Sequence, residues 1–319
     1  TTENLNKYFS LTPKIKEADL NVSPLSYDTY KNKLNLNLNT EDLIPSCYYF
    51  LGIKICPEGN TKYSSKVTLP KGTEFNGSLT IEKKGDVTVN GNLVINENLT
   101  INPGGKLTVN GSIYVNGWAA LNGSLTINGE NNFIYIHGYN GYYETIIKDF
   151  DFAGKMFSYP SVDIRNNFNT NGTVFVKKSV NIEDLVNDGG GTLVIIADGE
   201  IRIANNSLYT DEPKEIDAFL YSNQQMEIYG VGSHLQINGG VYGNPVILNV
   251  MKGKTKEKVA DTKNYDKKGG LYFEKNQDKI PPEKARLSII YKKDLILNPP
   301  TGIPTVDKIQ IKELNTSLN

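Results

Sequence analysis

A short motif, two apolar residues separated by one other residue, recurs along the first half of the sequence at a nearly fixed spacing. Three successive motifs fill 20 residues before the spacing repeats, so that Val67, Val87 and Leu107 are equivalent positions. A strand of three residues buries only about two side chains and is not stable alone. The motifs run from Val67 to Ile127 as VTL, TEF, LTI, VTV, LVI, LTI, LTV, IYV, AAL and LTI.

The repeat predicts that the chain winds into a tube, in which each strand pairs in parallel with its equivalent one turn later, about 4.8 Å away. The expected fold is all-β, a parallel β-helix (β-solenoid) with three-sided coils of about 20 residues, long loops and an N-terminal cap. The outer residues of each motif point into the tube and the middle residue points outward. Two of the outward columns are Thr68, Thr88 and Thr108, and Glu74, Val94 and Tyr114.

Asparagine and glycine recur at the expected corners of the tube. Asn90-Gly91, Asn110-Gly111 and Asn128-Gly129 fall at one corner of successive coils. Both residue types tolerate positive φ, and stacked asparagine side chains can hydrogen-bond along the tube. We therefore expect the asparagine column to be structural and not a binding array.

After Ile127 the motif persists with looser spacing, at IYI 134, VFV 174, VNI 180, LVI 193, IRI 201, MEI 226, LQI 235 and VIL 246. These motifs predict further coils, interrupted by an aromatic-rich loop at 139–159 and a polar loop at 205–218. A Lys-rich stretch at 252–270 has the alternating charges of a solvated loop. RLSIIY at 286–291 is expected to be a late strand.

These patterns divide one structural domain into four parts. We expect an N-terminal capping segment at 1–62, the solenoid at 63–250, a Lys-rich loop insertion at 251–285, and a final strand with a C-terminal tail at 286–319. A cap is needed because the end of a tube exposes its core and unpaired strand edges. Leu34, Leu36 and Leu38 alternate in a candidate capping strand.

Cys47 and Cys56, nine residues apart, are the two cysteines of the chain. A disulfide between them would staple the cap and would suit an oxidising exterior, and two buried free thiols are the alternative. Since the sequence begins at Thr1 without a signal pattern, we expect a mature ectodomain or an excised fragment.

The composition argues against several partners and kinds of site. The 34 Lys and Arg residues balance 35 Asp and Glu residues, which gives no basic field for nucleic acid or an anionic membrane. No apolar run approaches the length of about 20 residues that a membrane span needs. With two histidines and two cysteines, we expect no metal site and no cofactor.

Tubes of this kind often carry enzymes that act on polysaccharides, so a catalytic site is a candidate feature. A hydrolase needs two carboxylates about 5 to 9.5 Å apart. Asp149 with Asp151, and Asp184 with Asp188, are the pairs that could meet this need, but carboxylates are common on any surface. The three arginines lie in separate segments, which disfavours a lyase. We therefore expect no catalytic residues and a protein that is not an enzyme.

Aromatic residues give the stronger indication of function. Exposed rings suit the apolar faces of pyranose sugars, and a large apolar patch on a protein usually marks a partner site. An equally weighted alternative is that these rings pack on the tube as a small satellite core. The candidate carbohydrate-binding residues are Tyr114, Trp118, Tyr135, Tyr139, Tyr142 and Tyr143, with Tyr135 placed one coil beyond Tyr114.

Four segments carry a resemblance to a known family: LVIIADGEIRIANN (193–206), AFLYSNQQMEIYG (218–230), LQINGGVYG (235–243) and RLSIIYKKDLILNPPTGIP (286–304). They resemble the C-terminal domain of the tapirins, cellulose-adhesion proteins related to the minor pilin-like proteins of type IV pilus loci in Gram-positive bacteria. The resemblance implies a β-helix, secretion, attachment to the cell surface and an insoluble polysaccharide as target, with no catalytic residues to carry over.

The expected function is that of an extracellular, cell-surface, non-catalytic adhesin that binds insoluble plant polysaccharide, most of all cellulose. Cell-surface or pilus components are expected as further partners, and nucleic acid is not. One alternative is a pilus-associated or surface scaffold without affinity for glycans. A second alternative is a pectin-active lyase or hydrolase.

Overall fold

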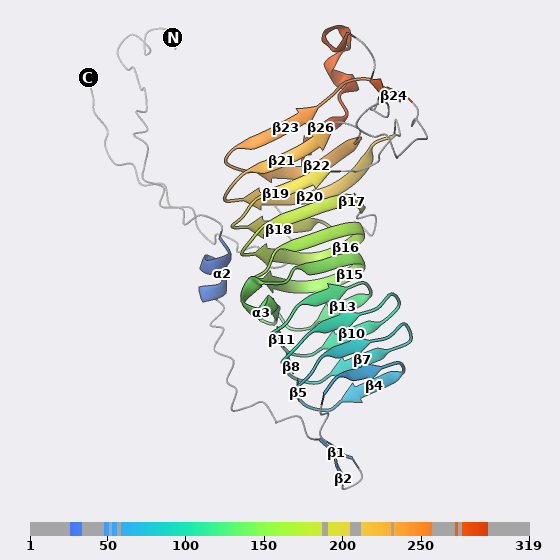
Figure 1. The fold of residues 1–319 in the computed structure, drawn as a ribbon, viewed down its shortest axis with the longest axis vertical. Helices are drawn as coiled ribbons and strands as arrows, with labels where there is room; N and C mark the ends of the chain where they lie inside the picture. The colour runs from blue at the N-terminus through green and yellow to red at the C-terminus, as the bar shows by residue number, and fades with distance from the viewer. Residues whose placement is uncertain are drawn as a thin grey trace, which may run out of the picture. The chain divides into compact units, whose positions relative to one another are not determined.

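The computed structural model describes residues 26–33, 48–50, 53–55, 59–186, 191–204, 212–230, 233–256, 272–273 and 276–292. Most of these residues form a parallel β-solenoid of about nine coils of roughly 20 residues (Figure 1). The predicted fold class is therefore confirmed.

The first half of the solenoid follows the 20-residue repeat. Thr68 pairs with Thr88, Thr88 with Thr108 and Thr108 with Thr126, as the repeat predicts. The strands of three parallel columns are β4 (Lys66–Leu69), β7 (Asp86–Val89), β10 (Lys106–Val109) and β13 (Ser124–Ile127); β5 (Thr73–Phe75), β8 (Leu93–Ile95), β11 (Ile113–Val115) and β14 (Ile134–Ile136); and β3 (Thr61–Tyr63), β6 (Leu79–Ile81), β9 (Leu99–Ile101) and β12 (Ala119–Leu121).

Longer strands continue the solenoid in the second half. Of the motifs predicted after Ile127, IYI 134 forms β14 and the others lie in these longer strands, which pair in parallel from coil to coil. They are β15 (Thr145–Ser158), β16 (Val162–Val176), β17 (Val180–Val186), β18 (Leu193–Ala197), β19 (Ile201–Ala204), β20 (Lys214–Ser222), β21 (Met226–Gly230), β22 (Leu235–Tyr242), β23 (Val246–Val250) and β26 (Leu287–Tyr291). The predicted late strand is confirmed as β26, which pairs with β22.

The two predicted loops of this half were wrong over much of their length. Residues 145–158 of the expected aromatic loop form β15, which pairs with β12, β13, β14 and β16. The strand passes the corners of the tube without an Asn-Gly break, and its bulge after Lys148 shifts the alternation of apolar residues. Residues 214–218 of the expected polar loop belong to β20, and residues 205–211 lie outside the described part.

The remaining elements lie outside the coils of the tube. They are α2 (Tyr27–Lys33), the antiparallel pair β1 (Tyr48–Phe50) and β2 (Ile53–Ile55), α3 (Gly138–Gly141), the antiparallel pair β24 (Thr255–Lys256) and β25 (Tyr272–Phe273), and the short helices η3 (Gln277–Lys279) and η4 (Pro282–Lys284).

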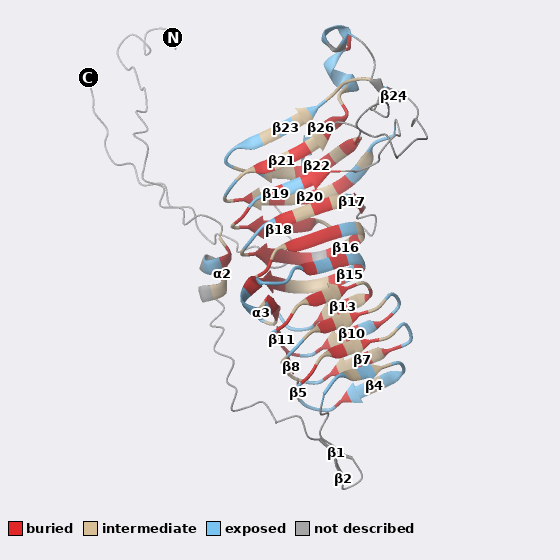
Figure 2. Cartoon of the chain, in the orientation of Figure 1, coloured by how far each residue is buried: buried red, intermediate tan, exposed pale blue. Residues whose placement is uncertain are grey.

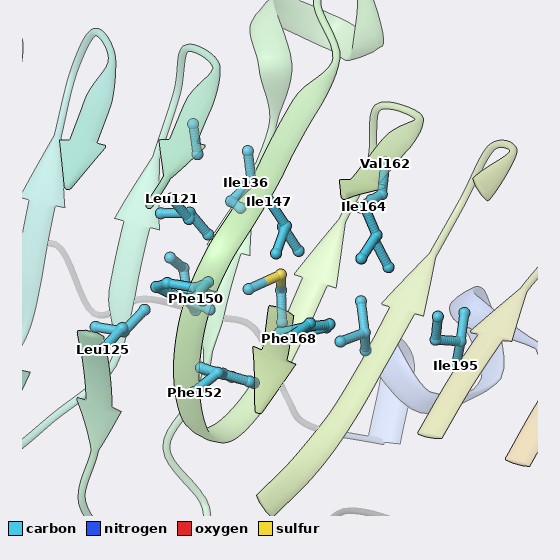
Figure 3. Packing of buried hydrophobic residues seen from close by; sticks show 14 of the residues in the cluster. Leu121, Leu125, Ile136, Ile147, Phe150, Phe152, Val162, Ile164, Phe168 and Ile195 are labelled. Carbon is cyan, nitrogen blue, oxygen red and sulfur yellow. The ribbon is translucent and has the colours of Figure 1, made fainter. Parts of the chain in front are cut away.

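The core is one continuous column of apolar side chains inside the tube. Val87 and Val89 are fully buried, whereas Thr88 between them is partly exposed, as the alternation predicts. Figure 2 shows buried and less buried positions alternating along the strands. In the wider middle coils Phe150 and Phe168 stack on each other, with ring centroids 6.0 Å apart (Figure 3). Burial of these side chains, at roughly 25 cal/mol per Å² of apolar surface, is the main force that holds the coils together.

The corners confirm the predicted asparagine column. Asn110 Nδ2 donates to Asn90 Oδ1 at 2.7 Å, and Asn128 Nδ2 donates to Asn110 Oδ1 at 2.7 Å. Gly91 has a φ of 137°, and a Cβ on Gly111 would lie 2.4 Å from the carbonyl carbon of Gly91. Glycine therefore lets the backbones of successive corners stack closely, and the asparagine amides link them.

Three predictions fall on residues outside the described part of the chain. The capping strand with Leu34, Leu36 and Leu38 is one, and most of the Lys-rich stretch is another. The third is the disulfide: β1 and β2 form an antiparallel pair between Cys47 and Cys56 in the sequence, but the cysteines themselves are not described. The capping strand, the solvated loop and the disulfide stay predictions.

Candidate functional site

One outward column of the tube is aromatic over much of its length. The register places Tyr135 on Tyr114, as predicted from the sequence, and continues the column through the second half of the solenoid. We call this set the aromatic column: Tyr114, Tyr135, Phe157, Phe175, Ile196, Tyr221 and Tyr242.

The rings of the aromatic column stack on one another along the tube. Phe157 and Phe175 have centroids 4.6 Å apart and planes 8° apart, and Tyr221 and Tyr242 have centroids 4.5 Å apart and planes 6° apart. Parallel rings at this separation lie face to face, because side-by-side rings would overlap. In these two pairs the facing sides of the rings are therefore covered by the neighbouring ring.

Helix α2 covers the middle of the aromatic column. Its Tyr27 packs edge-on against Phe157 with centroids 5.9 Å apart, and Tyr30 packs against Phe175 at 4.8 Å. Lys31 Nζ lies 5.2 Å from the ring centroid of Tyr135. Burial raises the pKa of Tyr30 to about 12. These contacts make a satellite core on the side of the tube, separate from the main core.

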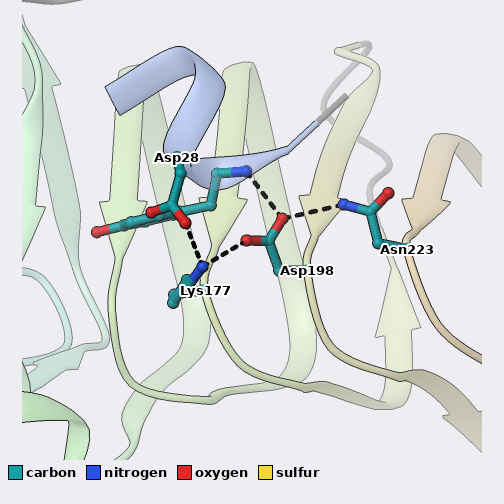
Figure 4. A network of polar contacts seen from close by, with 5 residues as sticks. Asp28, Lys177, Asp198 and Asn223 are labelled. Carbon is teal, nitrogen blue, oxygen red and sulfur yellow. Dashed lines mark hydrogen bonds and ion pairs between the residues drawn. The ribbon is translucent and has the colours of Figure 1, made fainter. Parts of the chain in front are cut away.

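A polar network fixes the first turn of α2 (Figure 4). The backbone N–H of Tyr27 donates to Asp198 Oδ1 at 2.9 Å, and Asn223 Nδ2 donates to the same oxygen at 3.0 Å. Lys177 Nζ lies 2.9 Å from Asp198 Oδ2 and also pairs with Asp28. Helix α2 is thus attached to three successive coils by both apolar and charged contacts.

The prediction that Tyr135 is an exposed sugar-stacking residue was wrong. Only 3% of Tyr135 is exposed, because α2 lies over it, and Tyr114 is half-buried beside it. For these two residues the alternative of a satellite core is right. No signal in the local sequence indicates this, since α2 lies more than 100 residues before the coils that it covers.

The other tyrosines of the predicted set lie on a left-handed turn between β14 and β15. Gly138, Tyr139, Asn140 and Gly141 have φ values of 61°, 47°, 64° and 75° in α3. For a residue with a side chain this conformation costs roughly 1–2 kcal/mol, so it persists only where the surroundings enforce it. We call residues 138–143 the tyrosine turn.

Backbone hydrogen bonds hold the tyrosine turn on the preceding coil. Gly138 N–H donates to the carbonyl oxygen of Gly117 at 2.9 Å, and Tyr139 N–H donates to that of Asn116 at 2.8 Å. Tyr142 N–H donates to Gly138 O at 2.8 Å within the turn. Lys178 Nζ donates to Gly141 O from the other side. The turn is therefore held by hydrogen bonds from coils before and after it.

The rings of the tyrosine turn are open to solvent. Tyr142 is 83% exposed, and Tyr143 and Tyr139 are 48% and 37% exposed. Tyr142 and Tyr139 each meet Tyr143 edge-on, with interplanar angles of 72° and 73°. Unlike the aromatic column, this group does not cover its ring faces by parallel stacking.

The structure brings four of the six predicted residues to one corner of the tube. Trp118, which is half-buried, precedes β12 at the corner where Tyr139, Tyr142 and Tyr143 precede β15, and β12 and β15 are paired. Glu97 lies one coil before Gly117 and two coils before the tyrosines. Its carbonyl oxygen accepts from Gly117 N–H at 2.8 Å, and its Oε2 accepts from Ser78 Oγ at 2.9 Å.

Sequence reasoning missed two features of this corner. The left-handed turn is marked by the string Gly-Tyr-Asn-Gly at 138–141, because glycine and asparagine are the residues that tolerate it best. Glu97 has no local signal. Burial, followed by the charge of Glu97, raises the pKa of Tyr139.

The carboxylates considered for catalysis serve other contacts. Asp151 Oδ1 accepts from Asn169 Nδ2 at 3.0 Å, and Asp149 Oδ2 accepts from Asn166 Nδ2 at 3.2 Å. Asp184 pairs with Lys214, and Asp188 lies outside the described residues. Over residues that the structure describes, no group of three or more His, Cys, Asp or Glu is placed to hold a metal ion.

Comparison with known proteins gives no relative from which a function can be transferred. No family model matches the sequence, and neither a curated protein nor a solved structure matches it. None of the helices in the described part of the chain has the length and apolar character that crossing a membrane requires.

Proposed function

We propose that this chain is a non-catalytic adhesin that binds insoluble plant polysaccharide outside the cell, with cellulose as the first candidate. The binding residues are Tyr139, Tyr142 and Tyr143 of the tyrosine turn, with Trp118 at the same corner. Tyr114 and Tyr135 of the original set support the satellite core and not the ligand. The β-solenoid fold is compatible both with adhesins and with polysaccharide-active enzymes, so the proposal depends on the site.

One observation carries the proposal: three exposed tyrosines lie on a strained backbone turn that the preceding coil holds in place. Strained conformations of this kind are concentrated at binding and catalytic sites. Rigid aromatic rings lose little conformational entropy on binding, and their apolar faces suit the faces of pyranose rings. The resemblance to tapirins agrees with this target and with a location on the cell surface.

A scaffold without glycan affinity is the second candidate, and a different surface favours it. On the last coil Leu248 of β23 and Ile290 of β26 are each about half exposed, at 49% and 48%, with Tyr291 at 64%. Exposed apolar residues on terminal strands are typical of contacts with another protein segment. Cell-surface or pilus components would be the partners in this case.

Adsorption to microcrystalline cellulose tests the proposal, with xylan and pectin in parallel. Because binding energy is concentrated in a few aromatic anchors, replacing Tyr142 and Tyr143 together by Ala should lower adsorption about tenfold or more. Thermal unfolding should hardly change, since both rings are exposed. Adsorption of the parent protein should survive salt at about 1 M, where the Debye length is about 3 Å.

Tyr242→Ala is the matched control, because Tyr242 is also about half exposed, at 49%, but lies at the far end of the aromatic column. Its adsorption should equal that of the parent protein. Equal loss in both variants would move the site away from the tyrosine turn. Failure of the parent protein to adsorb to any polysaccharide would favour the scaffold, and release of soluble products would show an enzyme.

A further inference from the structure

The rings of the tyrosine turn do not share a plane. Tyr143 contacts both of the others: its ring makes an angle of 72° with that of Tyr142 and of 73° with that of Tyr139, with ring centroids 5.3 and 5.8 Å apart. Edge-to-face contact at these separations is a favoured geometry of aromatic pairs and stabilises the arrangement. A flat surface that stacked on Tyr142 would therefore meet Tyr143 edge-on.

The rings are nevertheless open to a ligand. Tyr142 is 83% exposed, so its contact with Tyr143 covers little of its surface, and Tyr143 and Tyr139 keep 48% and 37% of theirs. The turn thus presents ring surfaces in two orientations at one corner of the tube. A ligand that uses both orientations needs to be narrow enough to contact one ring with its face and a second ring with its side.

The aromatic column, which is the long aromatic row of the tube, does not supply a flat open surface in its middle. Only 3% of Tyr135 is exposed under α2. Phe157 and Phe175 stack with planes 8° apart, so their facing sides are closed to a ligand. The face of a polysaccharide crystal is flat, and rows of coplanar exposed rings would match it. Neither the middle of this column nor the tyrosine turn has that arrangement.

Polar side chains accompany the rings on the turn. Asn140 is exposed between Tyr139 and Gly141, and Glu144 is exposed directly after Tyr143. The amide has both donors and an acceptor for hydrogen bonds, and the carboxylate is an acceptor. The hydroxyl groups of a separated glycan chain are open to such partners, whereas those of a chain inside a crystal layer bond to neighbouring chains.

We infer that the tyrosine turn binds single, separated glycan chains and not the flat face of a polysaccharide crystal, because its rings lie nearly at right angles and contact a chain from two directions. This inference rests on the proposed function and adds the physical state of the ligand. Insoluble cellulose offers both surfaces, since less ordered chains and chain ends accompany its crystal faces. A sugar stacks on one ring, and the second ring packs against the side of the chain and excludes water from the first contact.

Adsorption to swollen, largely amorphous cellulose and to highly crystalline cellulose tests this inference, with cellohexaose as a soluble competitor. At equal accessible surface the parent protein should bind the swollen polymer about tenfold more tightly, the difference that one further aromatic anchor makes. Cellohexaose is a single chain in solution, so it should displace the protein from the swollen polymer.

Tyr143→Ala separates the two modes of binding, because it leaves Tyr142 without the ring that stands across it. Adsorption to swollen cellulose should fall about tenfold, and adsorption to crystalline cellulose should stay within about twofold of the parent value. Thermal unfolding should hardly change, since Tyr143 is about half exposed. Tyr242→Ala is the matched control and should keep the preference of the parent protein, because Tyr242 is 49% exposed at the far end of the aromatic column.

The outcomes separate the inference from the proposed function. If adsorption depends on Tyr142 and Tyr143 but crystalline cellulose binds as tightly as swollen cellulose, or cellohexaose does not compete, the inference is wrong and the function stands. Equal losses on both polymers in Tyr143→Ala would also overturn the inference. If the parent protein adsorbs to neither polymer, both the function and the inference are wrong.

Discussion

At the scale of single residues, the tyrosines show how position in the coil decides what one side chain does. Tyr135 and Tyr142 lie only seven residues apart, yet one is 3% exposed and the other 83% exposed. Tyr135 is on a strand, in a column whose rings stack under α2. Tyr142 lies at a corner, on the tyrosine turn between two strands. The composition does not distinguish these two tyrosines, whereas their positions in the strand register explain the difference in exposure.

His137 connects the satellite core to the tyrosine turn and gives a prediction about pH. Burial, and then the charge of Lys31, lower the pKa of His137 below its ordinary value. The unfolded chain therefore binds a proton more readily than the folded one, and stability that is fully present above pH of about 6.5 should fall as the pH decreases. Thermal unfolding between pH of about 7.5 and about 5.5 measures this fall, before most carboxylates titrate.

Two glutamine variants identify the source of that pH dependence. His137→Gln keeps a polar partner for Asn116, whose Oδ1 lies 3.1 Å from His137 Nδ1, and should flatten the unfolding temperature over this range. His234→Gln tests the other histidine of the chain, and a slope that flattened in this variant alone would assign the effect to His234. A slope that persists in His137→Gln would assign the effect to another group.

At the scale of elements, the tyrosine turn is unusual because it contains four consecutive residues with left-handed backbone. The left-handed part of the turn is α3, which begins at Gly138 and ends at Gly141, and Tyr139 and Asn140 between them carry side chains at positive φ. The cost of this conformation is offset by hydrogen bonds to Asn116 and Gly117 on the coil below. Because residues of a neighbouring coil hold the turn in place, its geometry depends on that coil as much as on its own sequence.

Gly141→Ala and Asn140→Gly should affect this turn in different ways. A Cβ on Gly141 would lie 2.7 Å from Tyr159 Cδ1 and 2.9 Å from Lys178 Nζ, at a φ of 75°. Gly141→Ala should therefore lower the free energy of unfolding by about 1–3 kcal/mol and reduce cellulose adsorption.

Asn140→Gly removes a side chain from the left-handed region, which should raise the free energy of unfolding by about 1 kcal/mol. The greater conformational entropy of glycine in the unfolded chain offsets this gain. Denaturant titration of both variants tests this difference, and equal destabilisation would contradict the strain argument.

The elements also show why the sequence predicts one half of the solenoid better than the other. In the first half each strand has three or four residues and ends at a corner rich in Asn and Gly, so the repeat is visible as a spacing. Strands β15 and β16 run through 14 and 15 residues with bulges near Asp149 and Asn166, both at positive φ, which breaks the alternation. Helix α2 contacts coils more than 100 residues away in sequence, and no local pattern predicts such a contact.

Taken as a whole, the described tube is a one-dimensional array in which each coil contacts the coils before and after it. The stability of such an array is close to a sum of coil and interface contributions, so interior coils are held from two sides and end coils from one. Helix α2 adds a lateral link, because its contacts reach Phe157, Phe175 and Asp198 on successive coils. We therefore expect the middle of the tube to open last and its ends to open first.

Two chemically identical substitutions test this gradient, because Phe75 and Phe168 are both fully buried. Phe75 lies in β5 near the start of the tube, and Phe168 lies in β16 beside the coils that α2 covers. Phe168→Ala should lower the free energy of global unfolding by about 3–5 kcal/mol, as a cavity in a core with neighbours on both sides requires. Phe75→Ala should instead speed amide hydrogen exchange in β3 to β6 while exchange in β18 to β22 stays slow, since the end coils can open without the rest. Hydrogen exchange followed strand by strand measures both effects. If Phe75→Ala accelerated exchange equally in every coil, the tube would unfold as a single cooperative unit and the gradient would be absent.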